Sequence, residues 1–233
     1  MQEELFASFN EAMEARIRDM RDRLRKAFGE VPFNASRDPM SALVKSIISS
    51  RTKDEASLRA FNALVRLYPV WPDMRAAAPG DIAAAIHEVT DADDKARHVL
   101  LALAHVATRF PDYDLAPLGK EPMETALAWL RSLPGAGPKV AASVMNFSTL
   151  GRPALVMDRH VLRVFRRTGL AGRSTGDVAL NAMVMSGLRT WTSGQLSDLH
   201  VLVKRLGQQV CHARTAECHS CPLQSMCMTA RTA

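Results

Sequence analysis

Apolar residues recur at helical spacing along almost the whole chain, and the alternation typical of β-strands is nearly absent. The N-terminal segment repeats an apolar residue every four positions, at Leu5, Phe9, Met13 and Ile17. We expect this face of the first helix to pack inward. Proline, glycine and serine clusters separate the later segments. The sequence therefore predicts an all-α fold of about ten helices joined by short connections.

Several helix boundaries carry local signals. Asp38 followed by Pro39 predicts an N-cap and a first-turn proline. Thr52 with Glu55 three positions later fits a capping box for the next helix. Pro111 stops a longer helix. Helices are expected over residues 93–110, 138–149, 158–168, 176–188 and 195–209.

The charge of the chain favours an anionic partner. Its formal net charge is +6 and its pI is about 9.5, and nucleic acid is the commonest partner of such proteins. The N-terminus has no basic segment followed by an apolar block, so we expect no signal peptide. The most apolar run, residues 99–107, is too short to span a bilayer. We expect a soluble intracellular protein that does not bind membranes.

All four cysteines fall near the C-terminus, in a C-x6-C-x2-C-x5-C array. They are Cys211, Cys218, Cys221 and Cys227. Disulfides are disfavoured because there is no export signal and no cysteine elsewhere. Four closely spaced thiolates suit a tetrahedral zinc ion or an iron–sulfur cluster. The array predicts a metal site, and its spacing leaves both metals open.

The stretch LPGAGPKVA, residues 133–141, predicts a tight turn that leads into an apolar helix. Gly135 and Gly137 are expected to allow backbone angles and close approaches that a Cβ would forbid. Backbone amides that converge at a helix start form an anion site, and phosphate is the obvious occupant. The same residues would also suit an ordinary corner between two helices.

Lys139 stands in the first turn of that helix, where the partial positive charge of the N-terminus disfavours a cation. As a phosphate contact the lysine needs only its charge. As a nucleophile it must be neutral, and a desolvated lysine at a helix start is a plausible Schiff-base amine. The unfavourable placement indicates an amine that reacts.

Asp158 follows an apolar run and precedes the helix expected over 158–168. The position suits an N-cap, and a capping carboxylate keeps one oxygen for other work. Four arginines follow it and form either a solvated basic face or a surface that faces phosphates. They are Arg159, Arg163, Arg166 and Arg167.

The order of these motifs resembles the endonuclease III family of helix-hairpin-helix DNA glycosylases. The similar stretches are IISSRTKDEAS (47–57), LPGAGPKVA, VMDRHVLRV (156–164) and CHARTAECHSCPLQSMC (211–227). The resemblance extends from about residue 36 to residue 227. It implies two all-α lobes: a six-helix barrel with the hairpin at 37–152, and a cluster domain that joins 1–36 to 153–233. In this family Lys139 and Asp158 would meet in a DNA cleft between the lobes, and the four cysteines would bind a [4Fe–4S] cluster.

The resemblance also implies a function. The protein would be a base-excision-repair glycosylase with AP lyase activity on oxidised pyrimidines, with Lys139 as the nucleophile and Asp158 as the stabilising carboxylate. Its partner would be double-stranded DNA with damaged bases or abasic sites, bound by a monomer in the cytoplasm at the nucleoid. The implied DNA contacts are Arg51, Leu133, Gly135, Gly137, His160 and Arg214.

Two departures from the family leave the substrate open. Arg51 stands where the family commonly has a glutamine that fills the gap left by the flipped base. Residues 89–99 contain three aspartates and lack a recognisable leucine-bearing wedge. The alternatives are a monofunctional glycosylase for another lesion and a non-catalytic iron–sulfur protein that binds DNA. An adenine-mismatch glycosylase is disfavoured, since those relatives lack the lysine.

Overall fold

The computed structural model describes the backbone of residues 2–32, 37–172 and 174–231. Within these ranges the chain forms eleven α-helices and four short 3-10 helices, and no β-strand occurs there. The all-α expectation is confirmed. In the same part of the chain, no helix is both long and apolar enough to cross a membrane.

The chain divides into two compact units, residues 35–152 and residues 1–34 with 153–233. We call them the hairpin unit and the cysteine unit. The boundary expected near residue 36 borders residues 33–36, which lie outside the described residues.

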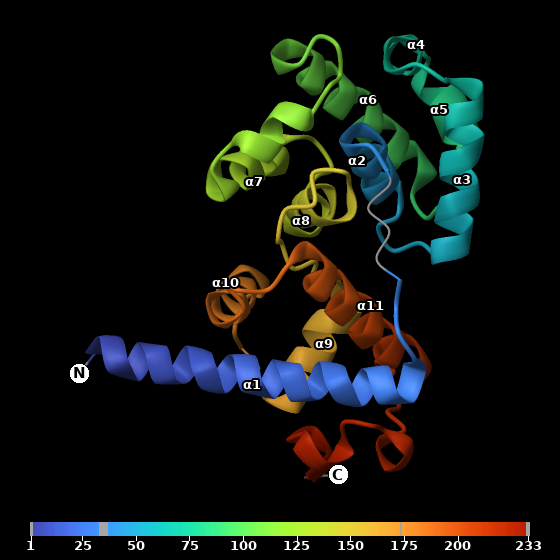
Figure 1. The fold of residues 1–233 in the computed structure, drawn as a ribbon. Coiled ribbons are helices and arrows are strands. Elements are labelled where there is room, and N and C mark those ends of the chain that lie inside the picture. The colour runs from blue at the N-terminus through green and yellow to red at the C-terminus, as the bar shows by residue number, and fades with distance from the viewer. Residues whose placement is uncertain (1, 33–36, 173, 232–233) are drawn as a thin grey trace. The chain divides into compact units, whose positions relative to one another are not determined.

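The hairpin unit is built around α2 (Pro39–Ile48), which packs against α3 (Asp54–Leu67), α6 (Ala92–Arg109) and α8 (Pro138–Phe147) (Figure 1). Two short helices complete this side of the unit. Helix α4 (Trp71–Ala76) packs on α6, and α5 (Pro79–Ala85) packs on both α6 and α3. Helix α7 (Met123–Ser132) precedes α8 and packs against it. Fully buried side chains such as Leu43, Leu64, Leu103 and Val144 form its core.

The two helix starts predicted in this unit have different outcomes. The Asp38 side chain accepts a hydrogen bond from the Ser41 backbone N–H at 2.9 Å, so the predicted N-cap of α2 is confirmed. The predicted capping box is wrong, because α3 begins after Lys53, whose side chain makes no capping bond. The Thr52 hydroxyl instead accepts bonds from Thr90 and Lys95, so a tertiary contact has replaced the local one.

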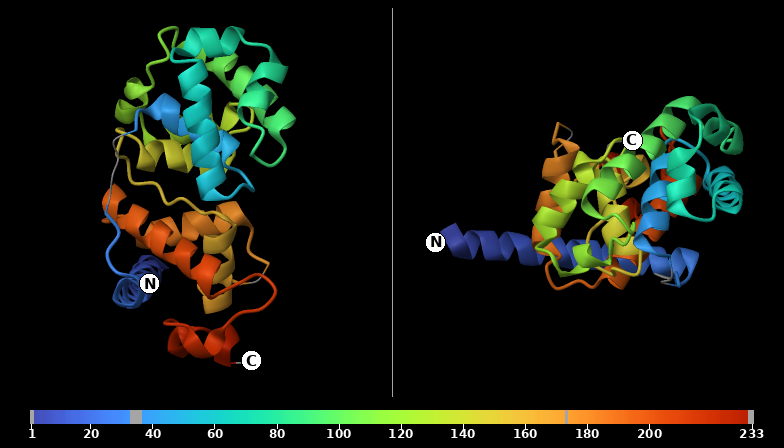
Figure 2. Two further views of the ribbon diagram at one scale, coloured as in Figure 1. Left: turned by 90° about the vertical axis from the view of Figure 1, so that its right-hand side faces the viewer. Right: turned by 90° about the horizontal axis from the view of Figure 1, so that it is seen from above.

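In the cysteine unit, α1 (Gln2–Phe28) packs along α10 (Asp177–Gly187) and α11 (Ser193–Gln209), and α9 (Arg159–Thr168) packs on α11. The C-terminal 3-10 helices are Cys218–Ser220, Gln224–Met226 and Thr229–Arg231. They lie at the C-terminal end of α9, where the Thr229 hydroxyl donates to the Arg167 carbonyl oxygen at 3.0 Å (Figure 2).

The apolar face predicted for the first helix is only half inward. Met13 and Ile17 are buried, whereas the side chains of Leu5 and Phe9 are 72% and 44% exposed. A helix of 27 residues is about 40 Å long, and the N-terminal turns of α1 extend beyond α10 and α11 (Figure 1). The expectation for Leu5 and Phe9 is therefore wrong, because those helices end before α1 does.

Candidate functional site

The hairpin of residues 133–137 joins α7 to α8. The side chains of Leu133 and Ala136 are each 2% exposed, and the Ala136 backbone N–H donates to the Leu133 carbonyl oxygen at 3.0 Å. Both side chains therefore anchor the turn in the core. A DNA contact at Leu133, as expected from the resemblance, would have to come from its backbone.

The two glycines of the hairpin have different roles. Gly135 has a φ of +77°, and a Cβ there would lie 2.8 Å from the His98 Cβ and 3.2 Å from Ile47 Cγ2. Gly137 is the N-cap of α8 with an ordinary φ of −72°, and no heavy atom lies within 4 Å of a Cβ built there. The expectation of a special backbone angle is confirmed at Gly135 and wrong at Gly137. At Gly137 the missing side chain leaves open space beside the start of α8.

Lys139 is half-buried in the first turn of α8. A second lysine lies near it: Lys95, in the first turn of α6, is only 5% exposed. The Lys95 ammonium donates to the Ser50 carbonyl oxygen at 2.5 Å and to Thr52 Oγ1 at 2.9 Å. This places a buried cation beside the proposed reactive amine.

The electrostatic surroundings of Lys95 are unfavourable to its charge. Burial is the main cause that lowers its pKa, to about 8. The carboxylate of Asp91 raises the pKa, while the charges of Arg51 and Lys139 lower it further. Our sequence reasoning missed Lys95. Its helical spacing with the buried residues Val99 and Val106 was the signal that it points inward.

Asp158 is the N-cap of α9. Its Oδ1 accepts hydrogen bonds from the backbone N–H groups of His160 at 2.8 Å and Val161 at 3.0 Å. The N-cap prediction is confirmed, and Oδ2 takes no part in either capping bond. The carboxylate is thus fixed by the helix start with one oxygen outside the cap.

Several groups keep Asp158 ionised. Burial, the largest influence, raises its pKa, but the charge of His200, the Val161 hydrogen bond and the charge of Lys204 outweigh it, and the pKa is lowered. His200 is buried on α11, and its Nδ1 lies 2.7 Å from the Val156 carbonyl oxygen. Sequence reasoning missed His200 and Lys204, because their proximity to Asp158 depends on the packing of α9 on α11.

His160 is packed between these two helices. A Cβ at Gly207 would lie 2.7 Å from the His160 Cβ, so α9 and α11 approach closely there. The His160 Nδ1 lies 3.1 Å from Arg163 Nη2. The pKa of His160 is lowered, and burial is the main cause. The DNA contact expected at His160 stays a prediction.

Two of the four arginines of α9 hold the cysteine loop in place. Arg163 donates to the carbonyl oxygens of Gly207 at 2.7 Å and Cys211 at 2.9 Å. Arg167 donates to the His212 carbonyl oxygen at 2.6 Å and to Cys211 Sγ at 3.2 Å. Both side chains are therefore engaged within the protein, where the sequence suggested a solvated or phosphate-facing surface.

The four cysteines line one cavity together with Arg167. Burial raises the pKa of the Cys221 thiol, and the neighbouring cysteines Cys211, Cys227 and Cys218 raise it further. In the part of the chain that the structure describes, no three His, Cys, Asp or Glu side chains are grouped so that they could hold a metal ion. Arg214, in the same loop, is exposed.

No protein-family model matches the chain. Among curated proteins, it is 25% identical over 197 residues to endonuclease III of Thermotoga maritima, covering 82% of this chain and 83% of the relative. It is 21% identical over 208 residues to a thymine-DNA glycosylase of Aeropyrum pernix, covering 85% of this chain and 86% of the relative. Among solved structures, a non-covalent endonuclease III–DNA complex matches with a TM-score of 0.77 and 22% identity, over 94% of this chain and 97% of that one.

The fold is that of the helix-hairpin-helix DNA glycosylases. With the endonuclease III proteins among its sequence relatives, the matches support the endonuclease III family for this chain. The resemblance inferred from the motifs is confirmed.

The two hairpin glycines should differ in how much an alanine substitution lowers the stability. Gly135→Ala should lower the free energy of unfolding by about 1–3 kcal/mol, because it adds a steric clash to an unfavourable φ. Gly137→Ala should change it by no more than about 0.5 kcal/mol, because the site is open. Urea unfolding followed by circular dichroism measures both. Equal losses would contradict the structure of the turn.

The cap at Asp158 predicts a pH-dependent stability. Asp158→Ala should lower the free energy of unfolding by about 1 kcal/mol at pH 7, while Asp158→Asn keeps a capping oxygen and loses only the contribution of the charge. Because folding lowers the pKa of this carboxyl, that contribution is present above its ordinary pKa and is lost as the pH falls through the folded value.

The difference between wild type and Asp158→Asn should therefore stay constant above about pH 5 and shrink as the pH falls below about 4 in urea unfolding. A difference that grows on acidification would mean that folding raises the pKa of Asp158.

Proposed function

We propose that the protein is a base-excision-repair DNA glycosylase with AP lyase activity, which removes damaged bases, oxidised pyrimidines foremost, from double-stranded DNA. Endonuclease III and thymine-DNA glycosylase relatives support the glycosylase class. The single observation that carries the lyase activity is the half-buried Lys139 in the first turn of α8. It directly follows a hairpin in which Gly137 leaves space beside the backbone. The location in the cytoplasm at the nucleoid and the monomeric state stay predictions.

The hairpin binds a phosphate of the DNA backbone in this proposal. Backbone N–H groups at the start of α8 have no intrahelical acceptor, and the helix adds partial positive charge. Gly137 leaves room for an oxygen of the ligand, since nothing within the protein occupies the position of a Cβ. Gly135 contributes by keeping the turn tight against α2 and α6.

The Lys139 amine is the nucleophile. A base inside a duplex cannot be reached, so the damaged nucleotide is first flipped out of the stack. The neutral amine then forms a bond to C1′ while the bond from C1′ to the base breaks, and the leaving base takes up a proton. Opening of the sugar ring gives the Schiff base. Loss of a 2′ proton together with the 3′ phosphate then nicks the strand on the 3′ side.

The Asp158 carboxylate stabilises the positive charge that develops on the sugar as the glycosidic bond breaks. This role needs the ionised form, which the lowered pKa provides. His200 and Lys204 act on Asp158 through their charges and are positioning residues in this scheme. Arg51, His160 and Arg214 remain the other predicted DNA contacts.

Cys211, Cys218, Cys221 and Cys227 would hold a [4Fe–4S] cluster. The chemistry of the donors fits, because four thiols line one cavity and no other donor type is required, although the described side chains are not grouped closely enough to hold a metal ion as they stand. These residues would use a bound cluster to hold the C-terminal loop together, and it would take no part in base removal. Arg167, which donates to Cys211 Sγ, fixes this loop to the end of α9.

The purified protein should contain about four iron atoms and about four acid-labile sulfides per chain. The expected sample is brown, and Cys227→Ser should lower its iron content. Elemental analysis with a sulfide assay makes the measurement. One zinc ion per chain without iron would contradict the cluster and favour the tetrahedral zinc site.

Borohydride trapping on a duplex with one abasic site tests the lyase activity. Wild type should give a covalent protein–DNA adduct, and Lys139→Ala should give none, because the amine that forms the Schiff base is gone. Lys120→Ala, which removes an exposed lysine of the same unit, is the matched control and should trap as wild type does. Asp158→Asn should still trap at a preformed abasic site but excise a damaged base at least about 100-fold more slowly.

Wild-type protein that binds the duplex without forming an adduct would contradict the lyase activity. Lys139 would then be a phosphate contact, and excision of a damaged base without strand cleavage would identify a monofunctional glycosylase.

A further inference from the structure

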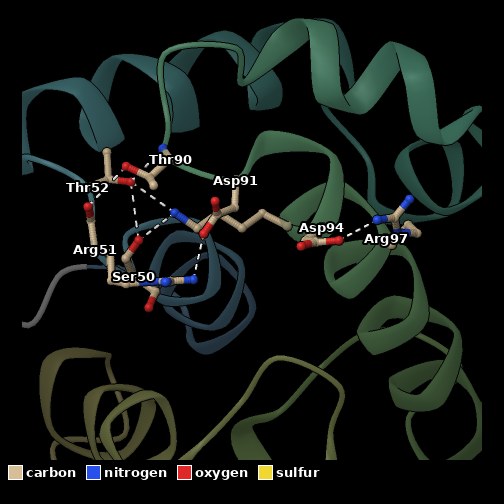
Figure 3. Close-up of polar contacts among 8 residues, drawn as sticks. Ser50, Arg51, Thr52, Thr90, Asp91, Asp94 and Arg97 are labelled. Carbon is tan, nitrogen blue, oxygen red and sulfur yellow. Dashed lines mark hydrogen bonds and ion pairs between the residues drawn. The ribbon is translucent and has the colours of Figure 1, made fainter.

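Two turns of the hairpin unit are held side by side by a dense set of hydrogen bonds (Figure 3). We call residues 49–53, between α2 and α3, and residues 89–92, at the start of α6, the paired turns. The Thr90 backbone N–H donates to Thr52 Oγ1 at 3.0 Å, and the Thr90 hydroxyl donates to the Arg51 carbonyl oxygen at 3.1 Å. The buried Lys95 ammonium adds its two bonds to Ser50 and Thr52. The two backbones are thereby fixed relative to each other.

Each turn presents one residue in the left-handed region of backbone space. Arg51 has a φ of 54° and Asp91 a φ of 55°. A non-glycine residue held there costs on the order of 1–2 kcal/mol, and such residues persist where the surroundings impose them, most often at functional sites. The hydrogen bonds of the paired turns impose this conformation on both residues. Arg51 and Asp91 are thus held in a backbone conformation that neither residue prefers by itself.

The side chains of the two strained residues meet at the surface. Arg51 Nη2 lies 2.5 Å from Asp91 Oδ2, and the two point toward each other (Figure 3). The side chains are 71% and 40% exposed, and exposed ion pairs stabilise a protein by only about 0–1 kcal/mol. Stability therefore gives a weak reason for this arrangement, and recognition of a ligand gives a better one.

The paired turns adjoin the hairpin that carries Lys139. Ile47, just before the first turn, and His98, one helical turn after Lys95, are the residues against which Gly135 packs. Lys95, beneath the paired turns, is close enough to Lys139 to feel its charge. The ion pair and the proposed nucleophile therefore belong to one surface of the hairpin unit. A nucleotide bound at the hairpin would then have its neighbouring bases close to the ion pair.

The two charges together match one base in particular. When a nucleotide is flipped out, its partner in the opposite strand loses its Watson–Crick hydrogen bonds. Guanine then presents an acceptor, O6, beside two donors, N1–H and N2–H. A guanidinium can donate to O6, and the two oxygens of a carboxylate can accept from N1–H and N2–H. Adenine, cytosine and thymine each lack the pair of adjacent donors that a carboxylate needs.

We propose that Arg51 and Asp91 read guanine in the strand opposite the flipped nucleotide, so that this enzyme acts on damaged or mispaired bases whose partner is guanine. The reading rests on the proposed function, because it requires an unpaired base opposite the reacting nucleotide. It also accounts for an acidic side chain on a surface that meets phosphates. Asp91 exchanges its bond with Arg51 for bonds with the base, so its charge stays compensated.

Equilibrium binding tests the proposal without any catalytic step. Four duplexes carry a stable tetrahydrofuran abasic analogue opposite guanine, adenine, cytosine or thymine, and their Kd values are measured at one salt concentration. Wild type should bind the guanine duplex at least about tenfold more tightly than the others. Asp91→Asn and Arg51→Gln should each remove most of this preference.

The chain offers a matched control. Asp94 and Arg97 form a second ion pair on α6 near the paired turns (Figure 3). Asp94→Asn and Arg97→Gln make the same changes of charge away from the two strained positions and should keep the guanine preference. Asparagine tolerates the left-handed conformation, so Asp91→Asn should fold with wild-type circular dichroism and melting temperature.

Equal affinity of wild type for the four duplexes would overturn the proposal, even if borohydride trapping at Lys139 succeeds. A guanine preference that survives in both Asp91→Asn and Arg51→Gln would also overturn it. So would a uniform loss of affinity for all four duplexes, which would make the pair a general DNA contact. A guanine preference that depends on the pair supports the proposal even if no trapped adduct forms, in which case only the lyase function would fall.

Discussion

The partial positive charge at the start of a helix acts on both proposed catalytic side chains, with opposite consequences. Asp158 caps α9 and accepts two backbone N–H bonds, so the helix start favours its carboxylate form. Lys139 stands in the first turn of α8, where the same field opposes an ammonium group. Asp158 is thereby held in the charged form that its proposed role requires, and the proposed role of Lys139 requires the neutral amine. The proposed roles of Asp158 and Lys139 thus depend on their positions at the starts of α9 and α8.

The position of α8 depends in turn on close packing within the hairpin unit. Gly135 lets the turn approach α2 and α6 to a distance that no side chain would allow. One of the paired turns follows α2 and the other begins α6, and the buried Lys95 ties the two turns together. One packed framework therefore carries the hairpin proposed to bind phosphate, the proposed nucleophile and the proposed guanine reader. Burying the charge of Lys95 costs free energy. Lys95 also interacts electrostatically with Lys139, so the paired turns and the proposed nucleophile are coupled through their charges.

Features that depend on neighbours in sequence were predictable, and features that depend on packing were not. Asp38 and Asp158 were recognised as caps because an N-cap binds amides only two or three residues away. Thr52 has the same local signature, but Thr90 and Lys95 bind its hydroxyl from another part of the chain. The expectation that Leu5 packs inward was wrong, because apolar periodicity does not show whether another helix is there to cover that face. His200 and Lys204 act on Asp158 only through the packing of α11 on α9.

The identity of the residue that joins to DNA tests the central claim most directly. The hairpin unit contains other buried or half-buried lysines, Lys45 and Lys95 among them, and Lys139 is the lysine in the first turn of the helix that follows the hairpin. Borohydride-reduced adduct from wild-type protein would be digested with protease and nuclease, and the modified peptide sequenced by tandem mass spectrometry. The account predicts a sugar remnant on Lys139. A remnant on Lys95, or on an exposed lysine such as Lys53, would contradict it.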